Sequence, residues 1–338
     1  MKKKLTALVL AGVMALSLAA CGAKEDAPAA SSTPAASSTP AESTPAAEVY
    51  TVGICQLAPH VALDAATQGF KDALTDALGD AVKFDEQNAA GDSPTCSTIV
   101  NGFVSANVDL IMANATSPLQ AAAAATTEIP VLGTSVTEYG VALGIQGFDG
   151  LVGTNVSGTS DLAPLSEQAD MIVEWFPEAK TVGLLYCSAE ANSQYQVDEV
   201  QKYLEAKGVT AVQYPFSDTN DMASVTQNAA DNCDVIYVPT DNTVANNTGI
   251  VDNICRPAKV PVIAGEEGIC SGCGVATLSI SYYDLGVATG EMAAKILTGE
   301  ADVSEMPIQY APQVTKKFNE AICADLGLTA PEGYVAIG

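Results

Sequence analysis

The sequence predicts the α/β fold class, with two lobes that each contain a parallel sheet. Short apolar runs rich in β-forming residues alternate with amphipathic helical stretches. The runs form two sets of four, and successive runs begin 33, 28 and 21 residues apart in the first set and 29, 24 and 27 in the second. These intervals are typical of β-α-β units, and runs that are apolar throughout indicate strands covered on both faces. The strands are expected to begin at Val49, Val82, Leu110, Val131, Val182, Ala211, Val235 and Val262.

Helices are expected in the intervals between the strands. They are Asp64–Leu78, Ser93–Ala106, Pro118–Thr127, Asn192–Lys207, Asp221–Asp231 and Asn242–Arg256. A glycine-rich segment, 153–160, and a helix with Trp175 separate the two sets. A further helix, Tyr283–Leu297, and a strand, Ile308–Thr315, follow the second set, so the chain is expected to cross between the lobes again. Such crossings form a hinge beside a cleft that can close on a ligand.

The first residues predict export. Lys2, Lys3 and Lys4 precede an apolar run from Leu5 to Leu18, which is shorter than the roughly 20 residues that a membrane-spanning helix needs. Residues 1–20 are therefore expected to be a signal peptide. The next residue is Cys21, and Leu18-Ala-Ala-Cys21 resembles the bacterial lipobox, which implies a lipid on this cysteine. The alternative is an ordinary secretory peptide that ends near a cysteine.

Residues 21–47 are expected to be the lipidated cysteine and an extended tether. The segment consists mostly of Ala, Ser, Thr and Pro, so it cannot bury enough apolar surface to fold. We expect the first lobe to contain residues 48–157 plus about 282–307. The second lobe is expected to contain residues 158–281 plus about 308–338.

The charge of the chain excludes some partners. The chain has 14 basic and 40 acidic residues, and without Lys2, Lys3 and Lys4 the 11 remaining basic residues leave a net charge of −29. Nucleic-acid binding requires clusters of basic residues, so it is excluded. Adhesion of the folded part to anionic lipid is also disfavoured, and we expect a monomer attached to the membrane only through Cys21.

Eight cysteines follow Cys21, and they are expected to be structural, either as free thiols or in disulfides. Cys55 and Cys187 fall in apolar strands, where cysteine acts as a small core residue. Cys270 and Cys273 have the spacing of a metal or redox motif, but there is no second such pair and His60 is the only histidine. We therefore expect no metal site.

Polar residues gather where the predicted strands end. Parallel sheets bind ligands at this edge, because loops and helix N-termini converge there. Any one of these residues could simply cap a helix, but the doublets Asp241-Asn242 and Glu266-Glu267 exceed what one cap requires. The strand-end residues include Gln56, His60, Asp64, Thr116, Ser117, Thr134, Ser135, Asn192, Ser193 and Thr240.

Carboxylates dominate this edge, and the only arginine, Arg256, lies elsewhere. A buried carboxylate pairs well with an ammonium group, so the edge is expected to bind a ligand that carries one. The carboxylate of an amino acid would be held by hydroxyls and N–H groups at helix starts, either at Thr116-Ser117 or at Thr134-Ser135. His60 is either a further donor or a loop residue. The acidic residues are Asp64, Asp161, Asp241, Glu266 and Glu267.

No motif of catalysis or of nucleotide binding is present in the sequence. There is no nucleophile elbow, phosphate-binding loop or dinucleotide fingerprint, and no metal-ligand cluster. We expect neither an enzyme nor a cofactor. A surface hydrolase that uses His60 is the least favoured alternative.

Several segments resemble the ABC-transporter substrate-binding proteins for tryptophan and tyrosine uptake. They are Cys55–Phe70, Gly158–Asp161, Ser188–Ser193, Val238–Val244, Gly265–Gly268 and Tyr282–Gly286. The resemblance implies a type I periplasmic-binding-protein fold, in which two Rossmann-like lobes joined by a multi-crossover hinge deliver an amino acid to a permease and its ATPase. The residues that it implies in the cleft are Gln56, His60, Asp64, Asp161, Asn192, Ser193, Thr240, Asp241, Asn242 and Glu267.

The preferred function is therefore a lipid-anchored receptor for an aromatic amino acid on the extracytoplasmic face of the membrane. Tyr139, Tyr282 and Tyr283 could stack on the ligand or pack in the core. The same fold could instead bind a sugar, a nucleoside or another small polar compound. A receptor that reports to a membrane sensor is a further alternative.

Overall fold

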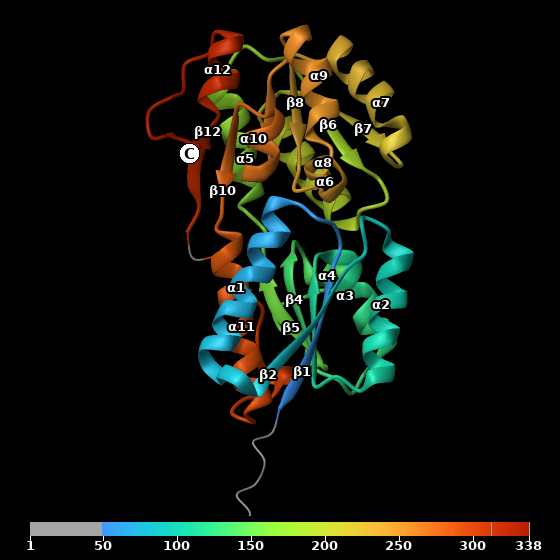
Figure 1. The fold of residues 1–338 in the computed structure, drawn as a ribbon. Helices are drawn as coiled ribbons and strands as arrows, with labels where there is room; N and C mark the ends of the chain where they lie inside the picture. The colour runs from blue at the N-terminus through green and yellow to red at the C-terminus, as the bar shows by residue number, and fades with distance from the viewer. Residues whose placement is uncertain (1–48, 312, 338) are drawn as a thin grey trace, which may run out of the picture. The chain divides into compact units, whose positions relative to one another are not determined.

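The computed structural model describes residues 49–311 and 313–337. These residues form two mostly parallel sheets, which confirms the predicted α/β class (Figure 1). The predicted signal peptide, Cys21 and the tether lie outside the described residues. The first sheet has the order β11 (Gln309–Tyr310), β5 (Val156–Ser160), β4 (Val131–Val136), β3 (Leu110–Asn114), β1 (Tyr50–Gln56) and β2 (Val82–Asn88).

Helices cover both faces of the first sheet. On one face α1 (Val61–Leu78) and α11 (Tyr282–Leu297) bury Ile54 of the sheet beneath Phe70 and Met292. On the other face α2 (Ser93–Ala106), α3 (Thr116–Ala125) and α4 (Tyr139–Leu143) bury Ile111. The inner strands β3 and β4 are fully buried because neither face meets solvent, whereas the edge strand β2 is mostly exposed and carries charged residues. Two short 3₁₀ helices, η1 (Gly79–Ala81) and η2 (Val303–Glu305), lie in connections of this part.

Helices α1 and α11 lie side by side although they are far apart in the sequence (Figure 1). Glycines allow this close approach. A Cβ atom on Gly286 would lie 2.0 Å from the carbonyl oxygen of Ala66, and one on Gly69 would lie 2.2 Å from that of Tyr283. The packing fixes the N-terminus of α11, and therefore Tyr282, against the first sheet.

The second sheet is also covered on both faces. Its order is β13 (Val335–Ala336), β12 (Thr315–Phe318), β10 (Ala276–Ser279), β9 (Val262–Ala264), β8 (Val235–Val238), β6 (Thr181–Cys187) and β7 (Thr210–Phe216). The pairing of β12 with β10 is antiparallel. One face carries α5 (Leu165–Trp175), α6 (Ala191–Ala206) and α12 (Glu320–Leu326), and the other carries α7 (Thr219–Asn232), α9 (Thr248–Ala258) and α10 (Glu267–Cys273).

Two expected elements are each divided in the structure. The helix expected over Asn242–Arg256 is interrupted at Asn246-Asn247, which separates α8 (Asn242–Ala245) from α9. The interruption leaves Asn247 outside helical geometry, with φ −137° and ψ 29°. The strand expected over Ile308–Thr315 was also wrong as a single element, because β11 joins the first sheet and β12 begins at Thr315 in the second.

The chain passes between the two sheets three times. The passages lie after β5, between β10 and α11, and between β11 and β12. The expected break at 281/282 coincides with the start of α11. The break expected at 157/158 falls inside β5, and the one expected at 307/308 falls just before β11. Both strands belong to the first sheet, where β11 pairs with β5 at the edge, so the chain leaves this sheet later than expected in each case. The division into two lobes remains a prediction.

The described residues hold eight free, buried cysteines. Within the same residues, no His, Cys, Asp and Glu side chains form a group of three or more that could bind a metal ion. Across 49–311 and 313–337, no helix has the length and apolar character needed to span a membrane.

Candidate functional site

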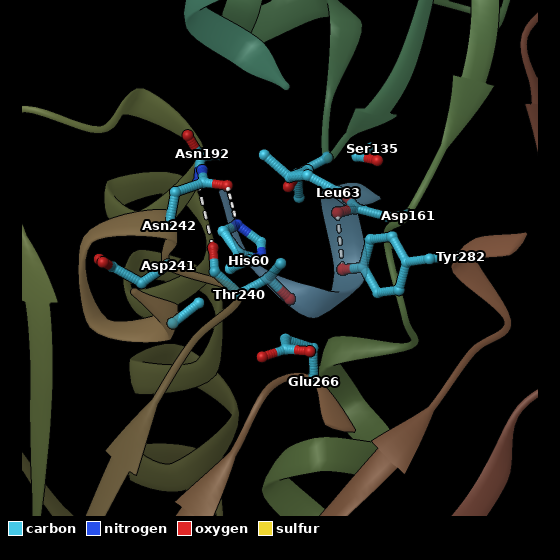
Figure 2. A pocket seen from close by; sticks show the side chains of 12 residues that line it. His60, Leu63, Ser135, Asp161, Asn192, Thr240, Asp241, Asn242, Glu266 and Tyr282 are labelled. Carbon is cyan, nitrogen blue, oxygen red and sulfur yellow. Dashed lines mark hydrogen bonds between the residues drawn. The ribbon is translucent and has the colours of Figure 1, made fainter. Parts of the chain in front are cut away.

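A small cavity lies where the strand ends of the two sheets meet (Figure 2). Its volume is about 10 Å³, which is room for about one water molecule. The cavity must therefore widen to admit an amino acid. Its lining residues are His60, Leu63, Ser135, Thr137, Asp161, Asn192, Thr240, Asp241, Asn242, Ala245, Glu266 and Tyr282.

Asp161 presents a free carboxylate oxygen to the cavity. It directly follows β5, at the first passage between the sheets, and only 4% of it is exposed. Its Oδ2 accepts a hydrogen bond from the Tyr282 hydroxyl at 3.0 Å, whereas its Oδ1 is buried without a partner. Burial raises the pKa of Asp161, and the hydrogen bond from Tyr282 opposes the rise. The free oxygen would gain most from a cationic partner.

Ser135 is the second residue with a buried, unpartnered oxygen at the cavity. The register between β4 and β5 shifts between Gly133 and Val136. Ser135 lies in this irregularity with φ +54°, a left-handed conformation that is unfavourable for serine. Irregularities of this kind re-aim a side chain at functional sites. Here the hydroxyl is left available as a donor.

Glu266 adds a second buried carboxylate to the cavity. It caps α10 and accepts hydrogen bonds from the backbone N–H groups of Gly268, at 2.6 Å, and of Ile269. Burial raises its pKa to about 7, and the negative charges of Asp161 and Glu267 contribute to the rise. Asp161 and Glu266 therefore repel each other across a site whose lining contains no Lys or Arg. A bound ammonium group would relieve this repulsion.

Asp241 lines the cavity but is occupied by the backbone. Its Oδ2 accepts from the N–H of Cys187 at 2.7 Å, and its Oδ1 accepts from that of Val244 at 2.9 Å. Burial raises its pKa to about 8, and the charge of Glu190 adds to the rise. Asp241 therefore fixes the start of α8 beside β6, and its position in the cavity wall follows from that role.

His60 and Asn242 meet across the cavity (Figure 2). His60 is the N-cap residue of α1, on the first sheet, and Asn242 begins α8, after β8 of the second sheet. His60 Nε2 lies 3.2 Å from Asn242 Oδ1. Burial lowers the pKa of His60, and this effect outweighs the hydrogen bond with Asn242 and the nearby carboxylates of Glu190 and Asp64.

The family described as ABC transporter substrate binding protein matches residues 51–336. The chain belongs to this family. Its members capture a solute outside the cytoplasm and present it to an importer, so the chain is an extracytoplasmic substrate-binding protein.

A curated relative of this substrate-binding protein is the tyrosine-binding protein of Clostridioides difficile strain R20291. The two are 34% identical over 321 residues, which cover 94% of this chain and 90% of the relative. This match, together with the family assignment, supports the fold and the general function predicted from the sequence.

Two solved structures are similar to this substrate-binding protein. An ABC domain from Streptococcus pneumoniae in complex with L-Trp is 32% identical, has a TM-score of 0.81, and covers 86% of this chain and 100% of its own. A ligand-free, open substrate-binding protein with adhesive properties from Clostridium difficile is 39% identical, with a TM-score of 0.66 and coverages of 86% and 99%. The present structure therefore superimposes better on the protein in complex with L-Trp than on the ligand-free, open protein, although the latter is more identical in sequence.

The structure brings half of the expected binding residues of this substrate-binding protein to the cavity. Those that line it are His60, Ser135, Asp161, Asn192, Thr240, Asp241 and Asn242. The side-chain amide of Asn192 donates to the carbonyl oxygen of Thr240 at 3.0 Å, which braces this wall (Figure 2). Their role as ligand contacts remains a prediction.

Other expected residues support the strands near the site without lining the cavity. Gln56 donates to Asp64 Oδ1 at 2.6 Å, and these two side chains brace the loop between β1 and α1. Thr134 and Thr159 share a hydrogen bond of 3.1 Å inside the first sheet. Buried Thr116 and Ser193 also lie outside the cavity lining.

Two residues that were expected to bind the ligand, Ser117 and Glu267, have partners outside this cavity. Ser117 shares a hydrogen bond of 3.0 Å with Ser93 and lines a neighbouring cavity of about 260 Å³. Glu267 pairs with Lys317 at 2.7 Å and accepts from Ser279. Of the Glu266-Glu267 doublet, only Glu266 lines the cavity. Its side chain caps the N-terminus of α10, and this places it at the cavity.

The aromatic candidates differ in position. Tyr282 lines the cavity, whereas Tyr139 is 1% exposed and donates to the carbonyl oxygen of Thr159 at 3.0 Å inside the first sheet. Tyr283 is exposed and donates to Asp72 at 3.0 Å. Only Tyr282 among these three can contact a ligand in the cavity.

The remaining lining residues outside the expected set are Leu63, Thr137 and Ala245. Leu63 and Ala245 give no polar signal in the sequence, because apolar residues near a helix start are common. Thr137 follows β4 and could have been included with Ser135 on the basis of its position alone.

Proposed function

We propose that the chain captures an amino acid by its ammonium and carboxylate groups in the cavity between the two sheets. The observation that carries the proposal is the pair of buried, unpartnered oxygens on Asp161 and Ser135. Buried polar atoms without partners are rare in native proteins, and those at a cavity point to a ligand. Asp161 Oδ1 would accept from the ammonium group, with Glu266 beside it, and the Ser135 hydroxyl would donate to the carboxylate.

Capture requires the cavity to open and close. A pocket for a small ligand usually has a volume of 300 Å³ or more, on the order of thirty times that of this cavity. Three passages of the chain between the sheets provide a hinge about which the two parts would separate. Closure would then surround the ligand with residues from both sheets.

An aromatic amino acid, namely Trp, Tyr or Phe, is the proposed ligand. The support comes from relatives, since one is named for binding tyrosine and another holds L-Trp. Tyr282 offers a ring at the cavity edge, where an aromatic side chain could pack edge-to-face.

We also propose that a lipid on Cys21 anchors the protein and that the chain has no catalytic activity. The expected tether would keep the folded part close to a permease and its ATPase, which are the partners that its family implies. The anchor is tested by labelling cells with a radioactive fatty acid. The wild-type chain should incorporate label and fractionate with membranes, and Cys21→Ser should do neither.

The ligand is tested with the compact unit that begins at Ala47. Titration calorimetry with all twenty amino acids should show binding of at least one aromatic amino acid. The same ligand without its amino group should not bind, because Asp161 would then be left without its cationic partner. If no amino acid binds and none raises Tm, the proposal is wrong.

Mass spectrometry of compounds that co-purify with the protein separates the alternatives. Recovery of a sugar or a nucleoside would replace the amino acid as ligand while keeping the same fold and the same importer role.

A further inference from the structure

The hydrogen bond between His60 and Asn242 directly joins the loop ends of the two sheets. It connects the N-cap of α1 to the first residue of α8 at 3.2 Å. Opening of the cavity must break this bond, because the two residues belong to different sheets. The bond therefore contributes to the lifetime of the closed form.

Glu190 determines which way the Asn242 side chain faces. Only 7% of Glu190 is exposed, and its Oε2 accepts from the backbone N–H of Asn242 at 3.0 Å and from the side-chain Nδ2 at 2.7 Å. An ionised carboxylate only accepts hydrogen bonds, so the Asn242 amide nitrogen must point toward it. The amide oxygen then faces His60, and His60 Nε2 must carry the proton of the shared hydrogen bond.

The contacts of Glu190 differ from those expected at its position in the sequence. It is the N-cap residue of α6, but its side chain makes no cap hydrogen bond with that helix. Instead, its Oε1 accepts from the backbone N–H and the hydroxyl of Thr243, both at 2.8 Å. Glu190 thus orders the first residues of α8, where Asp241 already provides the cap.

We propose that Glu190 is a positioning residue which, through Asn242, sets the rate at which the closed form releases its ligand. The proposal rests on the proposed function, since release presupposes a captured ligand. Glu190 itself does not line the cavity beside Asp161. It acts on the His60 contact through the Asn242 oxygen, and its Oε2 also accepts from the side-chain amide of Asn192 at 3.2 Å.

The proposal is tested with Glu190→Gln in the full-length protein, with L-tyrosine and L-tryptophan as probes. The amide keeps the size of the side chain but loses one acceptor, so Asn242 is no longer held in one orientation. Loss of one hydrogen bond corresponds to an increase of about fivefold in the dissociation rate constant. The association rate constant should stay within about twofold, because most interface changes act on dissociation.

A double-mutant cycle distinguishes positioning from general stabilisation. His60→Ala alone should also raise the dissociation rate constant about fivefold. In the His60→Ala background, Glu190→Gln should add nothing further. Glu199→Gln is the matched control, because Glu199 lies on the surface of α6 and pairs with Lys202 at 2.6 Å. An equal effect of Glu190→Gln in both backgrounds, or no effect in either, would overturn the proposal.

Two further measurements keep the test decisive. If Glu190→Gln does not fold, Glu190→Asp retains the charge but withdraws the carboxylate, and it should show the same non-additivity with His60→Ala. If the wild-type protein binds neither these probes nor any other amino acid, the proposed function fails. Small-angle scattering of the ligand-free protein then tests the contact alone. Both Glu190→Gln and His60→Ala should increase the radius of gyration, and unchanged scattering would refute the role of Glu190.

Discussion

The hydroxyl of Tyr282 donates to Asp161 Oδ2 at 3.0 Å and so links two of the passages between the sheets. Tyr282 begins α11, which packs on the first sheet through its contact with α1. This bond holds the carboxylate in one orientation and leaves Asp161 Oδ1 facing the cavity without a partner. The same pair thus connects the hinge to the proposed ammonium site.

Asp161→Asn should weaken binding of an amino-acid ligand on the order of 100-fold, because a buried charge pair with the ammonium group is lost. Its Oδ1 could still accept from Tyr282, so the fold should be retained. Titration calorimetry measures the loss. Asp170→Asn is the matched control, since Asp170 forms a surface ion pair with Lys207. Similar affinity in Asp161→Asn and the control would remove Asp161 from the site.

Ligand binding should weaken as the pH falls through about 7, the pKa of buried Glu266. Protonation of Glu266 removes a negative charge that favours the ammonium group. In the ligand-free protein, the contribution of Glu266 to folding stability changes with pH in the opposite direction. The pKa is higher in the folded than in the unfolded state, so the contribution of Glu266 to stability declines as the pH rises from about 4.5 to about 7.

The increase in Tm that L-tyrosine produces should therefore be larger at about pH 8 than at about pH 5.5. Differential scanning fluorimetry across this range measures it. Glu266→Gln cannot titrate at this position, so its curve should be flatter. A variant with the same pH dependence as the wild-type protein would show that other groups, such as Asp161 or Asp241, control the effect.

Two substitutions at Ser135 should separate its hydroxyl from its backbone strain. Ser135→Ala and Ser135→Gly both remove the hydroxyl, so each should weaken ligand binding by about fivefold to tenfold. Only glycine relieves the left-handed conformation at φ +54°. Ser135→Gly should therefore be more stable than Ser135→Ala by about 1 kcal/mol in urea unfolding. Equal stability of the two variants would show that the conformation is not strained.

The positions of the main strands along the chain could be predicted, because parallel strands that are buried on both faces have nearly continuous apolar sequences. The runs from Val49 to Val262 all became strands. Short elements at the sheet edges could not be predicted in the same way. Strand β11 has only two residues, Gln309 and Tyr310, and its pairing with β5 depends on contacts across the chain. Local sequence carries little information about such pairings.

Site residues could be predicted where their position at the end of a strand determines their role. They could not be predicted where a side chain's partners lie far away along the chain. Ser135 interrupts a strand that the sequence predicted, so the general rule for strand ends located it. Asp161 follows β5, which lies in a segment expected to be a glycine-rich crossing, so the resemblance to the family, not the strand rule, placed it in the cleft. Glu190 also ends such a loop, but its partners are Asn242 and Thr243, about fifty residues later. From sequence alone it is indistinguishable from a helix cap. In the Glu266-Glu267 doublet, only the three-dimensional course of α10 shows which carboxylate enters the cavity.

Gly286→Ala should destabilise the protein, because α11 cannot move its backbone away from α1 without disturbing the core beneath both helices. The added Cβ atom would lie 2.0 Å from the Ala66 carbonyl oxygen, and a backbone atom cannot rotate aside as a side chain can. We expect a loss of about 1 to 3 kcal/mol in the free energy of unfolding, measured with urea. Since α11 begins at Tyr282, ligand affinity should fall as well.

The control is Gly102→Ala in α2, where an added Cβ atom has nothing within 4 Å. Alanine favours the helix there, so this variant should be as stable as the wild-type protein or more stable by up to about 1 kcal/mol. Equal stabilities of Gly286→Ala and Gly102→Ala would show that the α1–α11 contact tolerates a wider spacing than the structure has.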